Sequence, residues 1–223
     1  MARGVEIVVA ERPAALVAER LVDVARAGGE IALTGGRTPG VAYELAAQLE
    51  PDWTRTAVWW GDERCVPPDD ERSNFALAKR TLLDDVRSGS VHRIHGELGR
   101  ENGAARYEEE LGGLERFDLV LLGLGPDGHV ASLFPDEPTL DETERRAVGA
   151  EARLEPYVDR ITLTLPALCA ARTVLFLVTG EDKADSVKRA FADEPSRSTP
   201  GSLVRATGGE TLAVLDAAAA AKL

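Results

Sequence analysis

The chain has few cysteines and no long apolar segment. Its 223 residues include only two cysteines, Cys65 and Cys169, which stand far apart and form no Cys-x-x-Cys pair of the kind that binds zinc or exchanges disulfides. We therefore expect free thiols and a reducing compartment. No stretch reaches the ~18 apolar residues of a membrane span, and the N-terminal apolar run is too short for a secretory signal. These absences predict a cytoplasmic protein with no membrane partner.

Positive charge is also scarce. The sequence has 26 Lys and Arg against 38 Asp and Glu, which gives a formal net charge of -12. Proteins that bind nucleic acids need clustered basic residues to hold the phosphate backbone, so this composition argues against a nucleic-acid partner. An anionic small molecule would be repelled at long range, and its binding would require a local basic pocket.

Several catalytic motifs are absent as well. The chain has no His-Glu-x-x-His and no Cys/His cluster, so a catalytic metal is poorly supported. It has no Gly-x-Ser-x-Gly nucleophile elbow, because Ser132 follows Val130 and Ala131 rather than standing between glycines. The Gly-Lys-Ser/Thr ending of a Walker loop is also missing. Metalloenzyme, serine-hydrolase and P-loop chemistry are therefore disfavoured.

Short apolar runs that end in glycine alternate with amphipathic stretches of helical period, which is typical of β–α units around a largely parallel sheet. We predict strands at residues 5–9, 31–33, 56–60, 117–122, 161–165, 173–178 and 211–215. We predict helices at residues 14–26, 41–49, 73–86, 104–111 and 182–191, and a terminal helix in the closing Ala-rich tract. Residues 1–223 are expected to form a single doubly wound α/β domain, with helices flanking the sheet and at most a small extra lobe.

The first candidate site follows the strand at 31–33. In open α/β sheets, ligands bind at the carboxyl ends of the strands, and here the sequence reads Gly35-Gly36-Arg37-Thr38-Pro39 before a helix. Bare glycines let backbone N–H groups approach an anion, and a helix N-terminus favours negative charge. The segment therefore predicts a phosphate site. The alternative is a tight turn capped by Thr38, with Pro39 near the first helical position.

The second candidate follows the strand at 56–60, where Asp62, Glu63 and Arg64 enter a loop and a helix starts near Ser73 and Asn74. Two acids beside one arginine can form a solvated ion-pair cluster. Their place after a strand favours a functional site instead. Both interpretations stay open at this point.

The third candidate is the most informative. A continuous apolar strand at 117–122 runs into GLGPDGH, residues 123–129. The segment formally matches the Gly-x-Gly-x-x-Gly of dinucleotide-binding folds, with Glu151 at a suitable spacing to bind a ribose, but Pro126 and Pro135 argue against the long helix that such a site requires. A carboxylate and an imidazole at a strand end instead indicate acid–base chemistry by Asp127 and His129. The structural alternative is a histidine bonded only to the loop backbone.

The fourth candidate follows the strand at 173–178, where a helix begins near Asp182 with Lys183 in its first turn. A lysine is unfavourable at the positive end of a helix unless an anion is bound there, so Lys183 is a candidate phosphate ligand. The alternative is a solvent-facing lysine balanced by Glu181 and Asp182.

Taken in order, the segments GGRTP, DERCVPPDDERSN, GLGPDGHVASLFP, LPAL and VTGEDK resemble the 6-phosphogluconolactonases, over nearly the whole chain. The resemblance implies an α/β fold shared with the sugar-phosphate isomerase-deaminases. It also implies hydrolysis of 6-phospho-D-glucono-1,5-lactone in the oxidative pentose phosphate pathway, with no metal or other cofactor and with the phosphosugar lactone as partner. The sequence leaves the oligomeric state open between a monomer and a small homo-oligomer.

The resemblance also assigns roles to residues. It places a general-base histidine at His129 and pocket carboxylates at Asp62 and Asp127. It places the phosphate loop and the basic substrate ligands at Gly35, Gly36, Arg37, Thr38, Arg64 and Lys183. The family usually has a small serine where this chain has Arg37, so that side chain either contacts the phosphate or points to solvent. Arg64 either binds the phosphate or polarises the lactone carbonyl.

Two other functions compete with lactone hydrolysis. The glucosamine-6-phosphate deaminases share the Gly-x-Gly-x-Asp-Gly-His core but follow it with a segment resembling FNEP, whereas this chain has SLFP and so lacks the acidic residue. The other competitor is a non-catalytic sugar-phosphate sensor on the same fold. The presence of His129 beside the candidate phosphate ligands disfavours a sensor.

Overall fold

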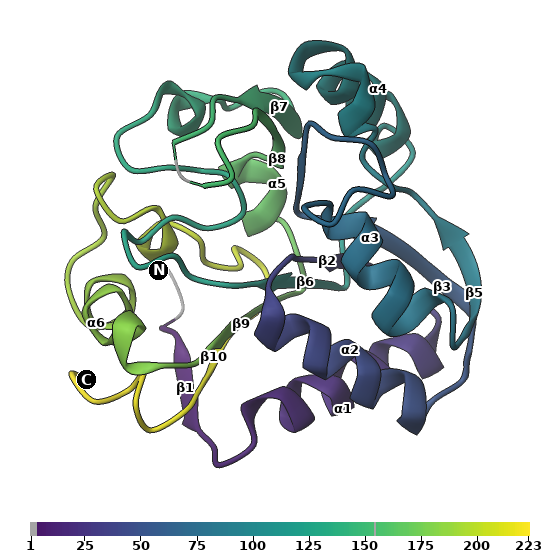
Figure 1. The fold of residues 1–223 in the computed structure, drawn as a ribbon. Coiled ribbons are helices and arrows are strands. Elements are labelled where there is room, and N and C mark those ends of the chain that lie inside the picture. The colour runs from purple at the N-terminus through teal and green to yellow at the C-terminus, as the bar shows by residue number, and fades with distance from the viewer. Residues whose placement is uncertain (1–3, 154) are drawn as a thin grey trace.

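The computed structural model describes residues 4–153 and 155–223. Its centre is a seven-stranded sheet in the order β1-β10-β9-β6-β2-β3-β5, in which every neighbouring pair is parallel (Figure 1). The strands are β1 Glu6–Val9, β2 Glu30–Leu33, β3 Asp52–Trp60, β5 Arg87–Val91, β6 Leu119–Leu122, β9 Thr173–Val178 and β10 Glu210–Leu215. The predicted largely parallel α/β fold is confirmed.

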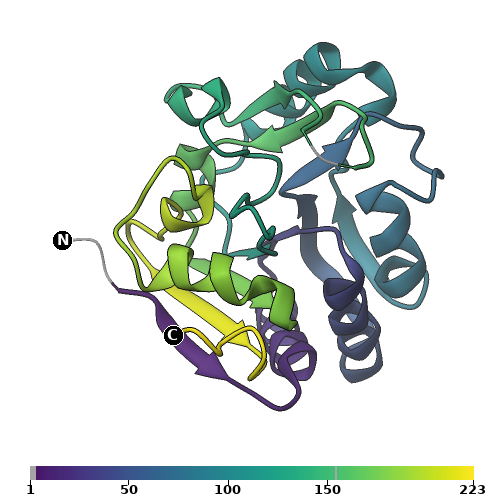
Figure 2. The same ribbon diagram turned by 60° about the vertical axis from the view of Figure 1, so that its left-hand side comes forward.

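Helices cover both faces of this sheet. They are α1 Pro13–Ala27, α2 Arg37–Leu49, α3 Asn74–Ala78, α4 Arg100–Leu111, α5 Leu165–Cys169 and α6 Ala184–Phe191. Figures 1 and 2 show α1, α2 and α3 on one side of the sheet and α4, α5 and α6 on the other. This division follows from right-handed crossovers, because the chain runs from β1 through β2 and β3 to β5 and then returns through β6 and β9 to β10.

The reversal of direction lies between β2 and β6, which are neighbours in the sheet. In doubly wound sheets a crevice forms at this point outside the carboxyl ends of the strands, and ligands bind there. The segments that follow β2 and β6 contain two of the four candidate sites, Gly35 to Pro39 and Gly123 to His129. The topology alone therefore brings these two segments together.

A second, antiparallel sheet of order β4-β8-β7 stands beside the main one, and its strands are β4 Asp62–Arg64, β7 Ala147–Ala150 and β8 Arg160–Leu163. The strand predicted at 161–165 exists as β8, but it belongs to this sheet and not to the parallel one. Its apolar sequence could not distinguish the two sheets, because β8 is buried along its whole length as the central strands are. Strand β4 directly extends β3 past Gly61, so it carries the second candidate site.

Other predicted elements differ from the structure in length or kind. The helix predicted at 73–86 is α3 followed by a π-helical turn, Lys79–Leu83. The predicted terminal helix is wrong, since residues 217–222 form turns, in which the backbone N–H of Ala219 donates to the Asp216 carboxylate at 2.7 Å. Helix nucleation is unfavourable, so the helix propensity of alanine alone does not form a helix over so short a segment.

The core contains two neighbouring tryptophans, and both cysteines are only partly buried. Trp59 and Trp60 are 4% and 0% exposed, so both pack in the core. Cys65 and Cys169 are free thiols, as expected. No described helix has both the length and the apolar character that a membrane span requires.

Candidate active site

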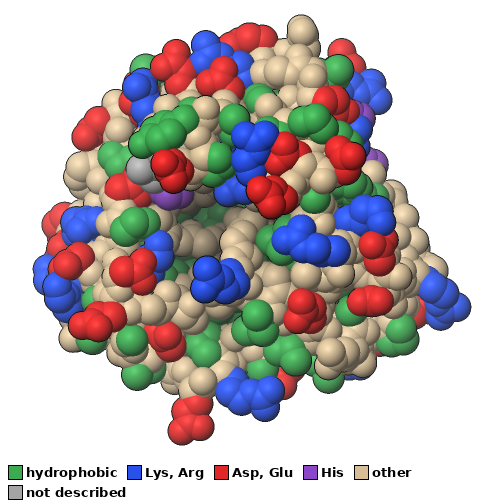
Figure 3. Space-filling model, in the orientation of Figure 1, with side chains coloured by type: hydrophobic (Ala, Val, Ile, Leu, Met, Phe, Trp, Pro, Cys, Tyr) green, Lys and Arg blue, Asp and Glu red, His purple; other side chains and the backbone are tan. Residues whose placement is uncertain are grey.

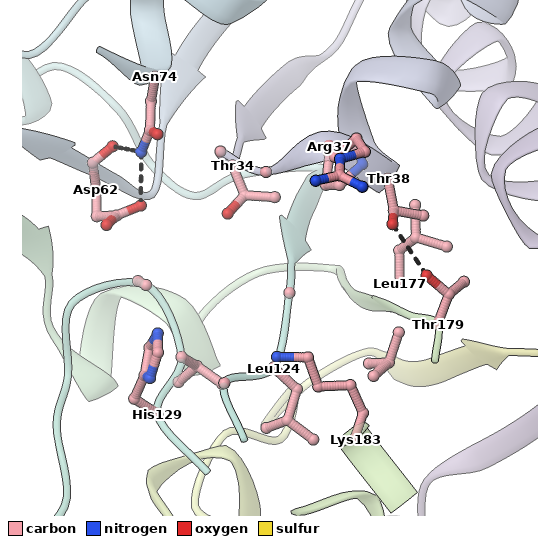
Figure 4. A pocket seen from close by; sticks show the side chains of 18 of the residues that line it. Thr34, Arg37, Thr38, Asp62, Asn74, Leu124, His129, Leu177, Thr179 and Lys183 are labelled. Carbon is pink, nitrogen blue, oxygen red and sulfur yellow. Dashed lines mark hydrogen bonds between the residues drawn. The ribbon is translucent and has the colours of Figure 1, made fainter. Parts of the chain in front are cut away.

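A cleft of about 320 Å³ opens at the carboxyl ends of β2 and β6. Figure 3 shows this hollow in the face of the molecule, and Figure 4 shows the side chains around it. Its walls include nearly all of the residues predicted for the site, namely Gly35, Gly36, Arg37, Thr38, Asp62, Arg64, His129 and Lys183. Asp127 lies behind His129 and does not form part of the wall. Four segments that are far apart in the sequence therefore meet at one site.

The glycine-rich segment begins helix α2 at the edge of the cleft. Gly36 is the N-cap residue and has a φ of 108°, which a residue with a side chain rarely adopts, and no side chain caps the helix. The first-turn N–H groups of α2 thus lack protein acceptors and remain open to an anion. The alternative of a turn capped by Thr38 is wrong, because the Thr38 hydroxyl instead pairs with that of Thr179 at 2.9 Å (Figure 4).

Gly35 permits a close approach between the glycine-rich segment and Asn74. A Cβ at Gly35 would lie 1.9 Å from the Asn74 Oδ1 atom, so only glycine fits. Asn74, at the start of α3, is 1% exposed. Its Nδ2 donates to the backbone oxygen of Asp62 at 2.9 Å and to the Asp62 Oδ1 at 3.0 Å (Figure 4). Asn74 therefore links the glycine-rich segment to the carboxylate of the second candidate site.

Strand alternation separates the three charged residues of β4. Asp62 and Arg64 line the cleft, whereas Glu63 is directed to the N-terminus of α3 and accepts hydrogen bonds from the N–H groups of Asn74 and Phe75, both at 2.8 Å. Asp62 and Glu63 are 6% and 3% exposed. In the described chain, neither carboxylate forms an ion pair with Arg64. The Nη1 of Arg64 instead donates to the backbone oxygen of Arg72 at 2.5 Å. The interpretation as a solvated ion-pair cluster is therefore wrong.

The Asp62 carboxylate is held from both sides. Its Oδ2 accepts a hydrogen bond from the Ser132 hydroxyl at 2.6 Å, and its Oδ1 accepts the bond from Asn74. Ser132 follows the GLGPDGH segment, so this pair joins the small antiparallel sheet to the loop after β6. The two donors fix the position of this buried carboxylate.

His129 carries a direct carboxylate partner. The Asp127 Oδ1 lies 2.5 Å from the His129 Nδ1 and also accepts the His129 backbone N–H at 3.2 Å. Burial raises the pKa of the Asp127 carboxyl, but its interactions with His129 outweigh burial and leave that pKa below its ordinary value. Because Asp127 occupies Nδ1 through this hydrogen bond, Nε2 is the ring nitrogen that remains available. Figure 4 shows the imidazole ring pointing toward the cleft. The alternative of a histidine bonded only to the loop backbone is therefore wrong.

Gly125 makes room for this pair. A Cβ at position 125 would lie 2.0 Å from the His129 Nδ1 and 2.5 Å from the Asp127 Oδ1. The backbone N–H of Gly125 also donates to the carbonyl of His129 at 2.9 Å, which closes the loop. The glycine at position 125 thus makes room for the imidazole and the carboxylate. The match to the Gly-x-Gly-x-x-Gly motif therefore does not indicate a dinucleotide site here.

Two cations lie elsewhere on the wall. Lys183 is 23% exposed in its side chain, and its Nζ is 3.7 Å from Asp182 Oδ2, too far for a strong hydrogen bond. Figure 4 shows its ammonium group pointing into the cleft, so it is not a purely solvent-facing lysine. Arg37 is exposed at the edge of the cleft and has no ion-pair partner among the described residues.

Two buried tyrosines hold the ends of the strands that lead to the site, and sequence reasoning missed both. The Tyr43 hydroxyl donates to the backbone oxygen of Thr34 at 2.7 Å and accepts its N–H at 2.9 Å. Tyr107 does the same for Trp60, at 2.9 and 3.1 Å. Burial raises the pKa of both phenols, so both stay protonated and can donate. Only the helical spacing of these aromatics was visible in the sequence.

Sequence reasoning also missed the supporting roles of Asn74, Ser132 and Thr179. Asn74 was visible only as part of a helix start, and Ser132 only as a poor nucleophile. Their partners lie more than ten residues away, so no local pattern identifies them. Among the described residues, no group of three or more His, Cys, Asp or Glu side chains is arranged to hold a metal ion.

Comparison with known proteins places the chain in a family. A family model described as "Glucosamine-6-phosphate isomerases/6-phosphogluconolactonase" matches residues 6–213. The 6-phosphogluconolactonase of Streptomyces coelicolor is 39% identical, and the match covers 96% of this chain and 90% of the relative. The 6-phosphogluconolactonase of Homo sapiens is 38% identical, and the match covers 88% of this chain and 81% of the relative. The solved 6-phosphogluconolactonase from Trypanosoma cruzi has a TM-score of 0.87 at 28% identity, covering 100% of this chain and 98% of its own. The resemblance seen in the sequence motifs is thereby confirmed, and the chain belongs to the family of glucosamine-6-phosphate isomerases and 6-phosphogluconolactonases.

Proposed function

We propose that this chain hydrolyses 6-phospho-D-glucono-1,5-lactone to 6-phospho-D-gluconate, as a step of the oxidative pentose phosphate pathway. Relatives named 6-phosphogluconolactonase at 39% and 38% identity support the reaction class. The observation that carries the proposal is the 2.5 Å contact between Asp127 and His129, beside a cleft that also holds an uncapped helix N-terminus and Lys183. A base and an anion site thus lie in one small cavity.

The phosphate of the substrate would bind at the start of α2. Gly35, Gly36 and the first turn of the helix present backbone N–H groups, and the Thr38 hydroxyl is held beside them by Thr179. The helix dipole favours a dianion at this end. Lys183 reaches the same space from across the cleft and, with the arginines of the wall, supplies local positive charge in a protein of net charge -12.

His129 would act as the general base toward water. Asp127 accepts a hydrogen bond from the Nδ1–H group and so leaves Nε2 unprotonated. Nε2 then takes a proton from water while the water oxygen attacks the lactone carbonyl carbon. The tetrahedral intermediate then breaks its bond between that carbon and the ring oxygen, and His129 returns the proton to the leaving oxygen. The atoms and the proton balance without a covalent enzyme intermediate.

Arg64 and Asp62 would prepare the carbonyl end of the substrate. The Arg64 guanidinium lines the cleft and keeps N–H donors free besides the one bound to Arg72, so it can polarise the carbonyl or hold the phosphate. Asp62 has both oxygens bound by Ser132 and Asn74. Its fixed position at the wall of the cleft suits it to orient a sugar hydroxyl.

A coupled assay tests the proposal. Freshly prepared 6-phosphogluconolactone is supplied to the purified protein, 6-phosphogluconate is detected with its dehydrogenase, and spontaneous hydrolysis is subtracted at every pH. Glucosamine 6-phosphate is tested in parallel for release of ammonia. We expect turnover of the lactone only. Ammonia release with an inert lactone would show a deaminase, and no turnover of either would support a sensor.

A further inference from the structure

A second cavity adjoins the active-site cleft. It has a volume of about 470 Å³ and lies between α2 and the segment formed by α3 and the following π-helical turn. The two cavities share Gly36, Arg37, Arg64 and Asn74 in their walls. They are therefore neighbours, and Arg37 and Arg64 stand at the boundary between them. A cavity of this size is in the range that binds small molecules, ~300–1,000 Å³.

The second cavity concentrates positive charge. Its walls contain the guanidinium groups of Arg37, Arg64 and Arg80, and none of the three has an ion-pair partner in the part of the chain that the structure describes. Two carboxylates, Glu44 and Glu71, also line it, which leaves a formal excess of one positive charge. In a chain of net charge -12, three arginines without ion pairs around one cavity are available to an anion.

The remaining wall restricts the class of ligand. The lining has no aromatic side chain, so it offers no surface on which a nucleotide base could stack. Its apolar part includes Val41 and Leu77. Leu77 approaches α2 closely because position 40 is glycine, where a Cβ would be 3.2 Å from the Leu77 Cδ1. Most of the lining residues are polar or charged, which suits a phosphate or sugar hydroxyls.

We propose that this cavity takes the second phosphate of a bisphosphorylated sugar whose first phosphate occupies the glycine-rich loop of the active site. This proposal rests on the phosphate site assigned above. Arg80 of the π-helical turn would hold the second phosphate, with Arg37 between the two. Because such a ligand occupies the active-site cleft as well, it excludes the lactone and acts as a competitive inhibitor that responds to bisphosphorylated sugars in the cell.

Calorimetric titration with glucose 1,6-bisphosphate and with glucose 6-phosphate tests the proposal. The variants are Arg80→Ala, Glu44→Gln and, as a control, Arg20→Ala, an exposed arginine of α1 that lines neither cavity. We expect the wild type to bind the bisphosphate at least about tenfold more tightly than the monophosphate. Arg80→Ala is expected to weaken bisphosphate binding about fivefold and leave monophosphate binding and lactone turnover unchanged. Glu44→Gln is expected to tighten bisphosphate binding, since it removes a negative charge.

Steady-state kinetics supply the second readout. The bisphosphate is expected to raise the apparent KM for the lactone and leave kcat unchanged, with a weaker effect on Arg80→Ala. Equal affinity of the wild type for the two sugars, or equal losses in Arg80→Ala and Arg20→Ala, would overturn the proposal. If either of these results is found while lactone turnover is normal, the proposed second phosphate site is refuted and the lactonase function is kept. An inert lactone combined with Arg80-dependent binding of the bisphosphate would refute the lactonase function and keep the second site.

Discussion

Replacement of Asp127 by asparagine tests how the carboxylate supports His129. One oxygen, Oδ1, accepts both the Nδ1–H of His129 at 2.5 Å and its backbone N–H at 3.2 Å. An asparagine can place its own Oδ1 there and keep both hydrogen bonds, so only the charge is lost. A hydrogen bond to a charged group contributes ~1.5–3 kcal/mol and a neutral one ~0.5–1.5 kcal/mol. The difference of about 1 to 1.5 kcal/mol corresponds to about a tenfold lower kcat.

Asp127→Ala removes the acceptor as well, and we expect about a 100-fold loss because the ring loses the partner that fixes its tautomer. Background-corrected kcat and KM of the two variants, with circular dichroism to confirm folding, give the comparison. Near-native turnover in Asp127→Ala, or a larger loss in Asp127→Asn than in Asp127→Ala, would refute the reasoning.

The Asp127→Asn variant also predicts an effect of pH on the free energy of unfolding. The folded pKa of Asp127 lies below its ordinary value of about 3.9, so the carboxylate stabilises the fold above that pH. The stability difference between the wild type and Asp127→Asn should shrink as the pH falls below about 4.

Three further substitutions test the site and its support. Lys183→Ala or Arg64→Ala should lower kcat/KM for the phosphorylated lactone by about 2 to 3 kcal/mol, and unchanged discrimination against unphosphorylated gluconolactone in both variants would contradict the assignment. Gly125→Ala should lower kcat about as much as Asp127→Ala, because its Cβ would lie 2.0 Å from the imidazole; a fully active, folded variant would refute this. Tyr43→Phe should reduce the free energy of unfolding by about 1 to 3 kcal/mol, measured by urea denaturation, and no change would show that the hydroxyl does not hold the strand end.

The sequence predicted the parallel sheet and the position of the cleft because both depend on local patterns. Apolar runs such as residues 117–122 must be buried strands, and the polar residues that follow them must lie at the carboxyl edge. Two of the four candidate segments thus meet where β2 and β6 lie side by side. The partnership of Asp127 and His129 was also accessible, because the residues are two positions apart.

The supporting contacts could not be predicted in this way. Asp62 is held by Asn74 and Ser132, which are 12 and 70 residues away in sequence. The antiparallel sheet that carries Asp62 was missed because β4 has only three residues and its sequence, Asp-Glu-Arg, resembles a charged loop. Its burial comes from pairing with β8, which is a tertiary contact and leaves no local pattern.

Turnover of 6-phosphogluconolactone by the His129→Asn variant is the most direct test of the account. We predict that kcat falls at least ~100-fold after subtraction of spontaneous hydrolysis, while the variant remains folded and still binds 6-phosphogluconate. In the wild type, kcat should decrease on acidification, because a protonated imidazole cannot accept a proton from water. A folded His129→Asn protein with near-native turnover would contradict the central claim that His129 activates water.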